Sequence, residues 1–123
     1  MRIFLSGVVA LILGSVSALA ADVSGTWKAS VALDDGRHTA PTFTLKQSGE
    51  KITGMFLIPA IGELPLSGTI RGNEFSFHVD VEESGIVFKL AYQGKIKDGK
   101  LAGTMLRTQD GNKIPGKFTA TKQ

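Results

Sequence analysis

The sequence predicts an all-β protein, an eight-stranded antiparallel up-and-down β-barrel. Three observations predict this class: apolar and polar residues alternate with a period of two in segment after segment, turn residues separate those segments, and no stretch of the mature chain has the 3.6-residue period of a long helix. Eight short strands with short connections also suit a β-sandwich. We favour the barrel because a closed sheet has no unpaired edge, and no segment looks like a protected edge strand.

Residues 1–20 have the organisation of a secretory signal peptide. Arg2 supplies a positive charge, an apolar run follows over residues 3–13, and small residues lead to an expected cleavage before Ala21. A membrane anchor is the alternative interpretation, but a run of about ten residues is too short to span about 30 Å of hydrocarbon. We therefore expect no membrane span, and a single β-barrel domain over residues 21–123.

The composition limits where the protein works and what it binds. The chain has no cysteine, which excludes disulfides and the lipid-modified cysteine of a bacterial lipoprotein. We expect a periplasmic or secreted protein that its core alone stabilises. One of the 14 basic residues, Arg2, belongs to the signal peptide, so against 11 acidic residues the mature chain has a net charge of only +2. Such a small excess gives no reason to expect nucleic acid as a partner.

The first predicted strand, residues 24–33, contains the only tryptophan of the chain. Trp27, Ala29, Val31 and Leu33 occupy alternate positions in it. This is the pattern of a strand with one buried face.

A long loop over residues 34–41 leads to three further strands. The second strand alternates around Phe43 and Leu45 and ends at a Ser-Gly turn. The third is apolar on both faces and stops at Pro59, and the fourth follows Gly62 and ends before an Arg-Gly-Asn turn. These strands are predicted at residues 42–47, 52–58 and 63–70.

Four more strands complete the predicted wall. The fifth has the cleanest alternation in the chain, and the sixth is the longest. The turns Lys-Asp-Gly and Gln-Asp-Gly-Asn bracket the seventh. These strands are predicted at residues 74–81, 86–96, 100–108 and 113–121.

Glycines gather on the predicted inward face, and most of them fall at the end of the barrel that holds Trp27. Glycine inside a strand costs entropy and packing, so a cluster of glycines needs a reason such as the close approach of a bulky ring. We predict that the indole plugs this end, where the turns are tight, and that the end with the longer loops is the mouth. The predicted plug comprises Trp27, Gly25, Gly54, Gly68, Gly94 and Gly103.

Gly25 and Trp27 at the start of the first strand resemble the opening G-x-W of the calycin barrels, the lipocalins and avidins, and the chain also resembles small exported bacterial proteins. The calycin resemblance implies eight sequential strands with a tryptophan at the closed end. In lipocalins an arginine of the last strand packs over that tryptophan, whereas this chain has only lysines there, at positions 113, 117 and 122. In avidins an asparagine follows the tryptophan by two residues and the third strand carries a tyrosine. Ala29 and Phe56 stand at those positions here, so we do not expect biotin to bind.

Arg107 is the most distinctive residue of the predicted mouth. Counting in twos along the seventh strand places it on the inward face, where an arginine needs an anionic partner such as Glu63, unless it reaches out to water at the rim. The predicted ligand-binding residues at the mouth are Arg107, Phe43, Phe56, Ile58, Leu64, Phe88, Glu63 and His38.

The two ends of the predicted barrel differ in charge. Acidic residues outnumber basic ones near the mouth, and the reverse holds near the plugged end. Charged turns keep a small barrel soluble. In addition, an acidic mouth disfavours anionic ligands, and a basic plugged end suits contact with an anionic cell surface. The many inward Phe, Leu and Ile residues predict a mostly filled barrel with a shallow apolar pocket at the rim.

We expect no catalysis, no metal and no cofactor. The two histidines, His38 and His78, are accompanied by neither an HExxH motif nor cysteine. There is no G-x-S-x-G motif, and the turn over residues 109–112 is too short for a calcium loop.

The third strand breaks the alternating pattern. Met55 and Leu57 should point outward, beside Pro65 of the fourth strand. A few exposed apolar residues are normal in soluble proteins, but a contiguous patch would indicate a protein partner or a homodimer.

Two functions remain open at this point. The leading hypothesis is an exported, non-catalytic binding protein that takes a small neutral or cationic apolar ligand at the open barrel end. The alternative is a protein-interaction or inhibitor-type barrel that binds a protein or cell-envelope partner through its outer wall or mouth loops. A mouth pocket with apolar walls favours the first, and a filled barrel with an exposed patch favours the second.

Overall fold

The computed structural model describes residues 21–59 and 61–123. The predicted signal peptide, residues 1–20, lies outside the described residues. The described residues form strands and turns without a helix, and so include no helix with the length and apolarity that a membrane crossing needs.

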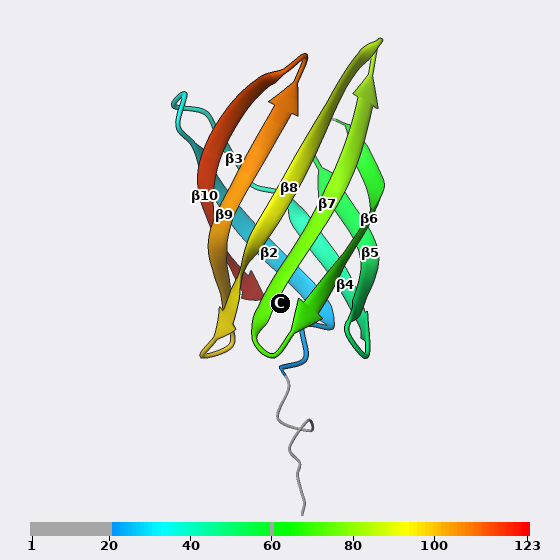
Figure 1. Ribbon diagram of the computed structural model, residues 1–123, viewed down its shortest axis with the longest axis vertical. Coiled ribbons are helices and arrows are strands. Elements are labelled where there is room, and N and C mark those ends of the chain that lie inside the picture. The colour runs from blue at the N-terminus through cyan, green and yellow to red at the C-terminus, as the bar shows by residue number, and fades with distance from the viewer. Residues whose placement is uncertain (1–20, 60) are drawn as a thin grey trace, which may run out of the picture.

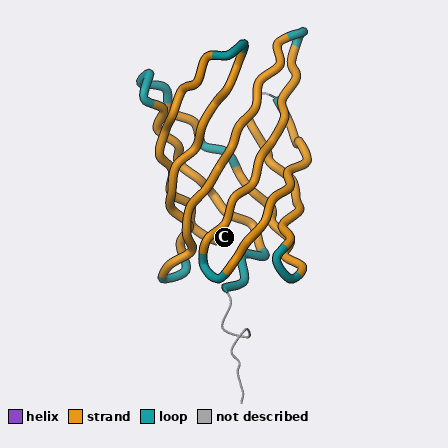
Figure 2. The backbone as a smooth tube through the Cα atoms, viewed as in Figure 1, coloured by secondary structure: helices purple, strands orange, loops and turns teal. Residues whose placement is uncertain are grey.

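Nine strand segments follow one another and close into an antiparallel barrel (Figures 1 and 2). From β4 to β10 each strand pairs with the next one along the chain, and β2 pairs with both β3 and β4. β10 returns to pair with β2 through seven residue pairs, from Gly116–Leu33 to Lys122–Trp27. The predicted eight-stranded barrel is confirmed, and this seam excludes the β-sandwich. The segments are β2 (Gly25–Leu33), β3 (His38–Thr39), β4 (Thr42–Ser48), β5 (Lys51–Ile58), β6 (Gly62–Arg71), β7 (Glu74–Glu83), β8 (Ile86–Lys97), β9 (Lys100–Gln109) and β10 (Asn112–Lys122).

One short strand was not predicted. β3 lies inside the expected loop 34–41 and pairs with the end of β2, so β3 and β4 together serve as the second strand of the wall. Pro41 separates them because its nitrogen carries no hydrogen to donate. Its carbonyl oxygen still accepts a bond from the Ala29 amide at 3.0 Å, so the wall stays continuous there.

The connections divide between two ends. The β4–β5, β6–β7 and β8–β9 turns lie at one end together with residues 21–24, the N-terminal segment of the described chain, as Figure 2 shows, and we call this the lower end. The β2–β3, β5–β6, β7–β8 and β9–β10 connections lie at the other, the upper end. The strands run between the two ends as an up-and-down barrel requires.

An aromatic layer fills the middle of the barrel. Ring centroids of neighbouring members lie 5.0 to 6.2 Å apart, in stacked and edge-to-face arrangements that aromatic pairs prefer. Every member is at most 4% exposed, so the barrel is closed at mid-height. The members are Phe43, Phe56, Phe75, Phe77, Tyr92 and Phe118.

Trp27 and the N-terminal segment close the lower end. The indole is 1% exposed, and its Nε1 donates to the Val23 carbonyl oxygen at 2.9 Å. Val23 is fully buried, and its amide donates to Oε1 of Gln47 in β4 at 2.9 Å. The Lys122 ammonium lies 5.6 Å from the centre of the Trp27 ring. A lysine of the last strand therefore stands over the tryptophan, in the region where the lipocalin resemblance implies an arginine.

The inward glycines serve the bending of the wall. A Cβ added at Gly68, Gly94 or Gly103 would lie 1.9 to 2.1 Å from a backbone oxygen of the neighbouring strand, and Trp27 is not among the three nearest atoms at any of them. Each of the three is paired across strands with a phenylalanine: Gly68 with Phe77, Gly94 with Phe75 and Gly103 with Phe118. Glycine bends covered by aromatic rings are a known device for curving a barrel wall. The requirement for glycine at these three positions thus comes from the adjacent backbone.

Candidate functional site

A ring of half-buried apolar residues lies above the aromatic layer at the upper end. Its members pack on top of the core and are partly exposed on their upper side, so they form a shallow apolar surface inside the rim. We call this set the upper ring, and it consists of Ile58, Ile61, Leu64, Phe88 and Ile114.

Arg107 of β9 is the polar group of this end. Its guanidinium carbon lies 4.1 Å from the centre of the Phe88 ring, within the range of a cation–π contact. The ion pairs found among the described side chains do not include Arg107. Glu63, the partner expected from the sequence, is exposed and alternates with the inward Leu64 on β6. Arg107 therefore rests on an aromatic face with no described carboxylate in contact.

The β2–β3 loop brings two further charges near Arg107. Arg37 and Asp35 of that loop form an ion pair at 2.7 Å, and this contact lowers the pKa of Asp35. Burial lowers the pKa of Arg107, and the charge of Arg37 lowers it further, whereas Asp35 acts in the opposite direction. Arg37 is thus paired with Asp35, and the charged group that contacts the upper ring is the Arg107 guanidinium.

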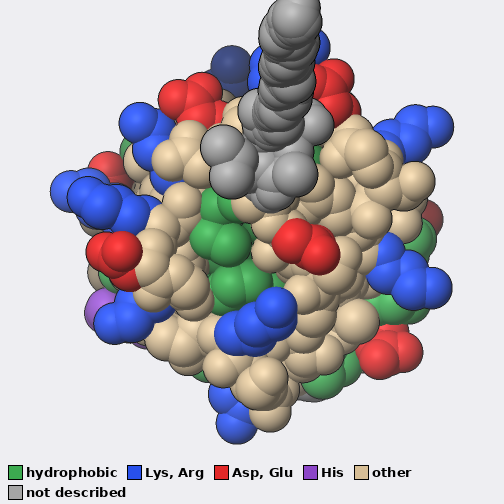
Figure 3. Space-filling view, turned by 90° about the horizontal axis from the view of Figure 1, so that it is seen from below, with side chains coloured by type: hydrophobic (Ala, Val, Ile, Leu, Met, Phe, Trp, Pro, Cys, Tyr) green, Lys and Arg blue, Asp and Glu red, His purple; other side chains and the backbone are tan. Residues whose placement is uncertain are grey.

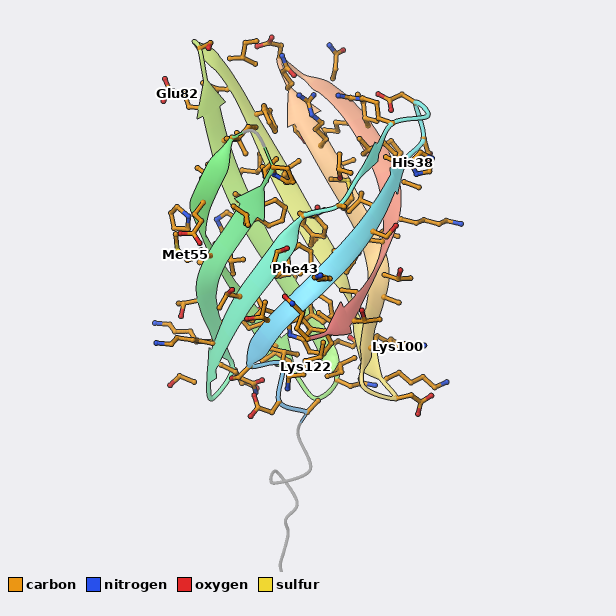
Figure 4. The ribbon with its side chains drawn as sticks, turned by 180° about the vertical axis from the view of Figure 1, so that it is seen from behind. His38, Phe43, Met55, Glu82, Lys100 and Lys122 are labelled. Carbon is orange, nitrogen blue, oxygen red and sulfur yellow. The ribbon has the colours of Figure 1, made fainter. Side chains whose placement is uncertain are left out.

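The predicted mouth residues are only partly brought together. Ile58, Leu64, Phe88 and Arg107 reach the upper end as expected. Phe43 and Phe56 instead belong to the buried aromatic layer below it, 0% and 1% exposed. The structure places His38 and Glu63 on exposed positions of the wall (Figure 4 for His38).

Two members of the upper ring were not among the predicted site residues. Ile61 lies in the β5–β6 connection, where no periodicity indicates which way a side chain points. Ile114 is the direct partner of Arg107 across the β9–β10 hairpin. Counting back in twos from the buried Phe118 would have placed Ile114 on the inward face.

The wall is incompletely paired beside the upper ring. The described pairing of β6 with β7 ends at Ser67–His78, and that of β8 with β9 ends at Lys89–Thr108. Above those points β7 and β8 pair with each other up to Glu83–Ile86. Residues 79–88 therefore form a two-stranded ribbon, here called the rim ribbon, whose tip carries Ile86 and Val87 at 50% and 61% exposure. Figure 1 shows this hairpin projecting beyond its neighbours.

The outer wall has the expected apolar positions. Met55 and Leu57 are 38% and 39% exposed, and Figure 4 shows Met55 pointing away from the barrel. Pro65 is exposed and is the direct partner of Met55 across β5 and β6.

Metal-ligating side chains do not converge within the described part of the chain, where no three His, Cys, Asp or Glu residues are grouped. His38 lies on β3, while His78 lies on the outer face of β7. The histidines thus stand on separate parts of the wall.

No protein-family model matches this chain, and no curated protein does. Solved structures do resemble it. The structure of EF1p2_mFAP2b bound to DFHBI superposes with a TM-score of 0.61 at 15% identity, over 82% of this chain and 94% of that one. A redesigned β-barrel gives a TM-score of 0.59 at 13% identity, over 87% and 94%. The complex of short afifavidin with biotin gives 0.46 at 17% identity, over 85% and 94%. The first two likenesses show a common fold, a closed antiparallel barrel.

Proposed function

We propose that this chain is a non-catalytic binding barrel that takes a small ligand at its upper end, with the ligand's apolar body on the upper ring and an anionic group on Arg107. The observation that carries the proposal is the Arg107 guanidinium, held 4.1 Å over Phe88 among half-buried apolar residues. A planar guanidinium on an aromatic face keeps its donors available for a carboxylate or sulfonate in bidentate geometry. Because the Arg107 side chain is already held in place, it loses less conformational entropy when a ligand binds.

The filled barrel limits the size of the ligand. Because the aromatic layer closes the middle, only the space above it can receive a guest. A ligand there is held by partial burial and one charged contact. The fold shared with EF1p2_mFAP2b, which was solved bound to the small molecule DFHBI, supports this class of function.

The proposal departs from the sequence-based expectation in the sign of the ligand's charge. Counting acidic residues near the mouth predicts a neutral or cationic ligand. The described acidic residues of the upper end are exposed, however, and one of them, Asp35, is neutralised by Arg37. The charge that reaches the apolar surface is that of Arg107, which favours an anion.

Binding of 8-anilinonaphthalene-1-sulfonate, an apolar dye with one negative charge, tests the proposal. We expect saturable fluorescence enhancement by the folded protein, and an affinity about tenfold lower in Arg107→Gln, the loss of one charge-assisted contact. Arg71→Gln at the lower end removes the same charge and should leave the affinity within about twofold. Equal losses in both variants, or tighter binding of a cationic dye of similar size, would overturn the assignment of an anionic ligand to Arg107.

The exposed patch of Met55, Leu57 and Pro65 supports a second candidate function, association with a protein partner or a second copy. Gel filtration of Leu57→Lys beside the parent protein tests self-association. We expect the charged variant to elute later if the patch is a dimer interface, since burying a lysine there is costly. Identical elution volumes would count against an interface between copies at this place.

We further propose that the protein is exported and that residues 1–20 are removed. The pattern of charge, apolar run and small residues supports this. Val23 is fully buried soon after the expected new terminus at Ala21, so the domain can begin there. Native mass spectrometry of protein purified from its own host should give a mass that starts at Ala21, and the same spectrum would reveal a ligand or partner that co-purifies.

A further inference from the structure

An open groove lies on the outer wall over β6 to β9 and reaches Pro115 of β10 at its upper limit. Its lower part has a volume of about 1100 Å³ and its upper part about 730 Å³, and the two share Thr69, Ser76, Gln93 and Thr104. A barrel wall is convex outside, so a concavity needs a cause. Gly94 and Gly103, which are direct partners, line the lower part at the bend of the wall.

The four shared residues form one straight polar row. Thr69 pairs with Ser76, Ser76 with Gln93, and Gln93 with Thr104, so the row crosses four neighbouring strands. All four side chains are exposed, and none takes part in the side-chain hydrogen bonds found among the described residues. With strands about 4.8 Å apart, the row extends about 14 Å. It presents hydroxyl and amide groups that can both donate and accept.

Basic residues lie below the polar row. Lys97 and Lys100 are direct cross-strand partners beside the β8–β9 turn, a like-charge arrangement that destabilises a hairpin. Neither is in an ion pair among the described side chains. An anion bound between the two ammonium groups would relieve their repulsion. Figure 4 shows Lys100 projecting at the lower end, and Figure 3 shows blue side chains spread around that end. The charged lining residues are Arg71, Lys95, Lys97 and Lys100 against Glu74 and Asp98.

We propose that this groove binds an acidic polysaccharide, with sugar hydroxyls on the polar row and the carboxylates on Lys97 and Lys100. The hydroxyl and amide groups of the polar row favour a hydroxyl-rich polymer over a lipid surface, because they can donate to and accept from sugar hydroxyls. A single-stranded nucleic acid would need exposed aromatic rings on which its bases could stack, and the polar row has none. An extended peptide finds no unpaired strand edge along the polar row itself, since β6 to β9 are paired with one another there and the unpaired part of β7 begins only above Ser67–His78.

Binding of polygalacturonate, an acidic polysaccharide, tests this inference. The protein is used in the form that is purified from its host, and dextran, a neutral polysaccharide, is the control ligand. We expect polygalacturonate to bind in a salt-sensitive manner and dextran not to bind. The double variant K97Q/K100Q should weaken binding about tenfold or more. The matched control K28Q/K46Q removes two exposed lysines from β2 and β4, outside the groove, and should change it less than about twofold. Gln93→Ala should weaken binding while leaving its salt dependence unchanged, because it removes a neutral hydrogen-bonding group.

Several results would overturn the inference. Equal weakening by K97Q/K100Q and K28Q/K46Q would indicate attraction to the whole protein. Equal binding to polyglutamate, or to phosphatidylglycerol vesicles, would indicate another class of partner. None of these outcomes bears on the dye experiment at Arg107, which concerns the opposite end of the barrel.

Discussion

Tyr92 is the only tyrosine of the chain and lies in the aromatic layer at 2% exposure. Its ring is 5.0 to 5.6 Å from those of Phe43, Phe56, Phe77 and Phe118. The side-chain hydrogen bonds found among the described residues do not include its hydroxyl group. A buried hydroxyl without a partner costs free energy that an apolar side chain of the same shape avoids.

Replacing Tyr92 with Phe should therefore stabilise the barrel, by about 1 kcal/mol in the free energy of unfolding at neutral pH. Burial raises the pKa of Tyr92 above its ordinary value of 10.0. Below pH 10 the hydroxyl is protonated in both states. Above pH 10 it ionises in the unfolded chain but not in the barrel, so the parent loses stability as the pH rises and the variant is spared this loss.

Urea titrations of both proteins at pH 7 and at pH 11 measure this difference directly. The gap in stability should widen at the higher pH. A variant that is less stable than the parent at pH 7 would mean that the hydroxyl makes a stabilising contact.

Two cations rest on aromatic faces at opposite ends of the molecule. Lys122 stands over Trp27 below, and Arg107 stands over Phe88 above. The lower pair covers a fully buried indole that closes the barrel. The upper pair lies beside half-buried residues, so the same kind of contact leaves a charged group accessible to a ligand.

At the scale of the strands, the bends are made where glycine and phenylalanine are paired. A Cβ at Gly103 would lie 2.0 Å from the Gln93 carbonyl oxygen, and one at Gly94 would lie 2.1 Å from that of Ala102. A backbone oxygen moves only if the strand moves. The close approach of β8 and β9 therefore depends on the absence of side chains at these two positions.

Gly103→Ala should destabilise the barrel by at least about 1–3 kcal/mol, because the added methyl group forces two paired strands apart. Ala102→Ser at the exposed neighbouring position is the control and should stay within about 0.5 kcal/mol of the parent. Thermal unfolding followed by the fluorescence of the single tryptophan reports both values. Unchanged stability in Gly103→Ala would mean that the wall can straighten there without loss.

At the scale of the whole molecule, one core holds the barrel together without any disulfide. The described residues contribute 21 buried apolar side chains to this core, from Val23 to Ala120. Cooperative unfolding is expected of such a domain. The rim ribbon is the exception. Above Ser67–His78 and Lys89–Thr108 its two strands are described as paired only with each other, and not with β6 or β9.

Amide hydrogen exchange should separate these two behaviours. Amides at the tip of the rim ribbon should exchange through local opening, well before those of the aromatic layer, which should exchange only with global unfolding. Binding of the anionic dye at the upper ring should slow exchange at Phe88. Uniform protection across β7 and β8 would show that the ribbon is as stable as the rest of the wall.

Much of this architecture could be predicted from local pattern. A period of two identifies a strand and its inward face, and glycine, proline and aspartate identify where the strand ends. The strands predicted over residues 42–47, 74–81 and 100–108 each fall within β4, β7 and β9. β3 was missed because it spans only two residues, too few to show a period.

The candidate site was predictable only in part, because contacts between distant strands have no local signal. Counting in twos placed Arg107 on the inward face. Testing Glu63 as its partner required knowing which residues of β6 point inward, and Glu63 is on the exposed side. The stacking of Arg107 on Phe88 joins two positions that are not direct register partners, so neither alternation nor pairing indicates it.

By itself, then, the sequence determined the all-β class, the positions of most strands and the side that each presents to the core, since these follow from alternation and turn residues along the chain. Only the tertiary structure decided that Phe43 and Phe56 close the middle, that glycines accommodate neighbouring backbone, and that Thr69, Ser76, Gln93 and Thr104 align in one row. The physical reason is register. Which residues meet across strands depends on how the sheet shears as it closes on itself, and that closure is a property of all the strands together.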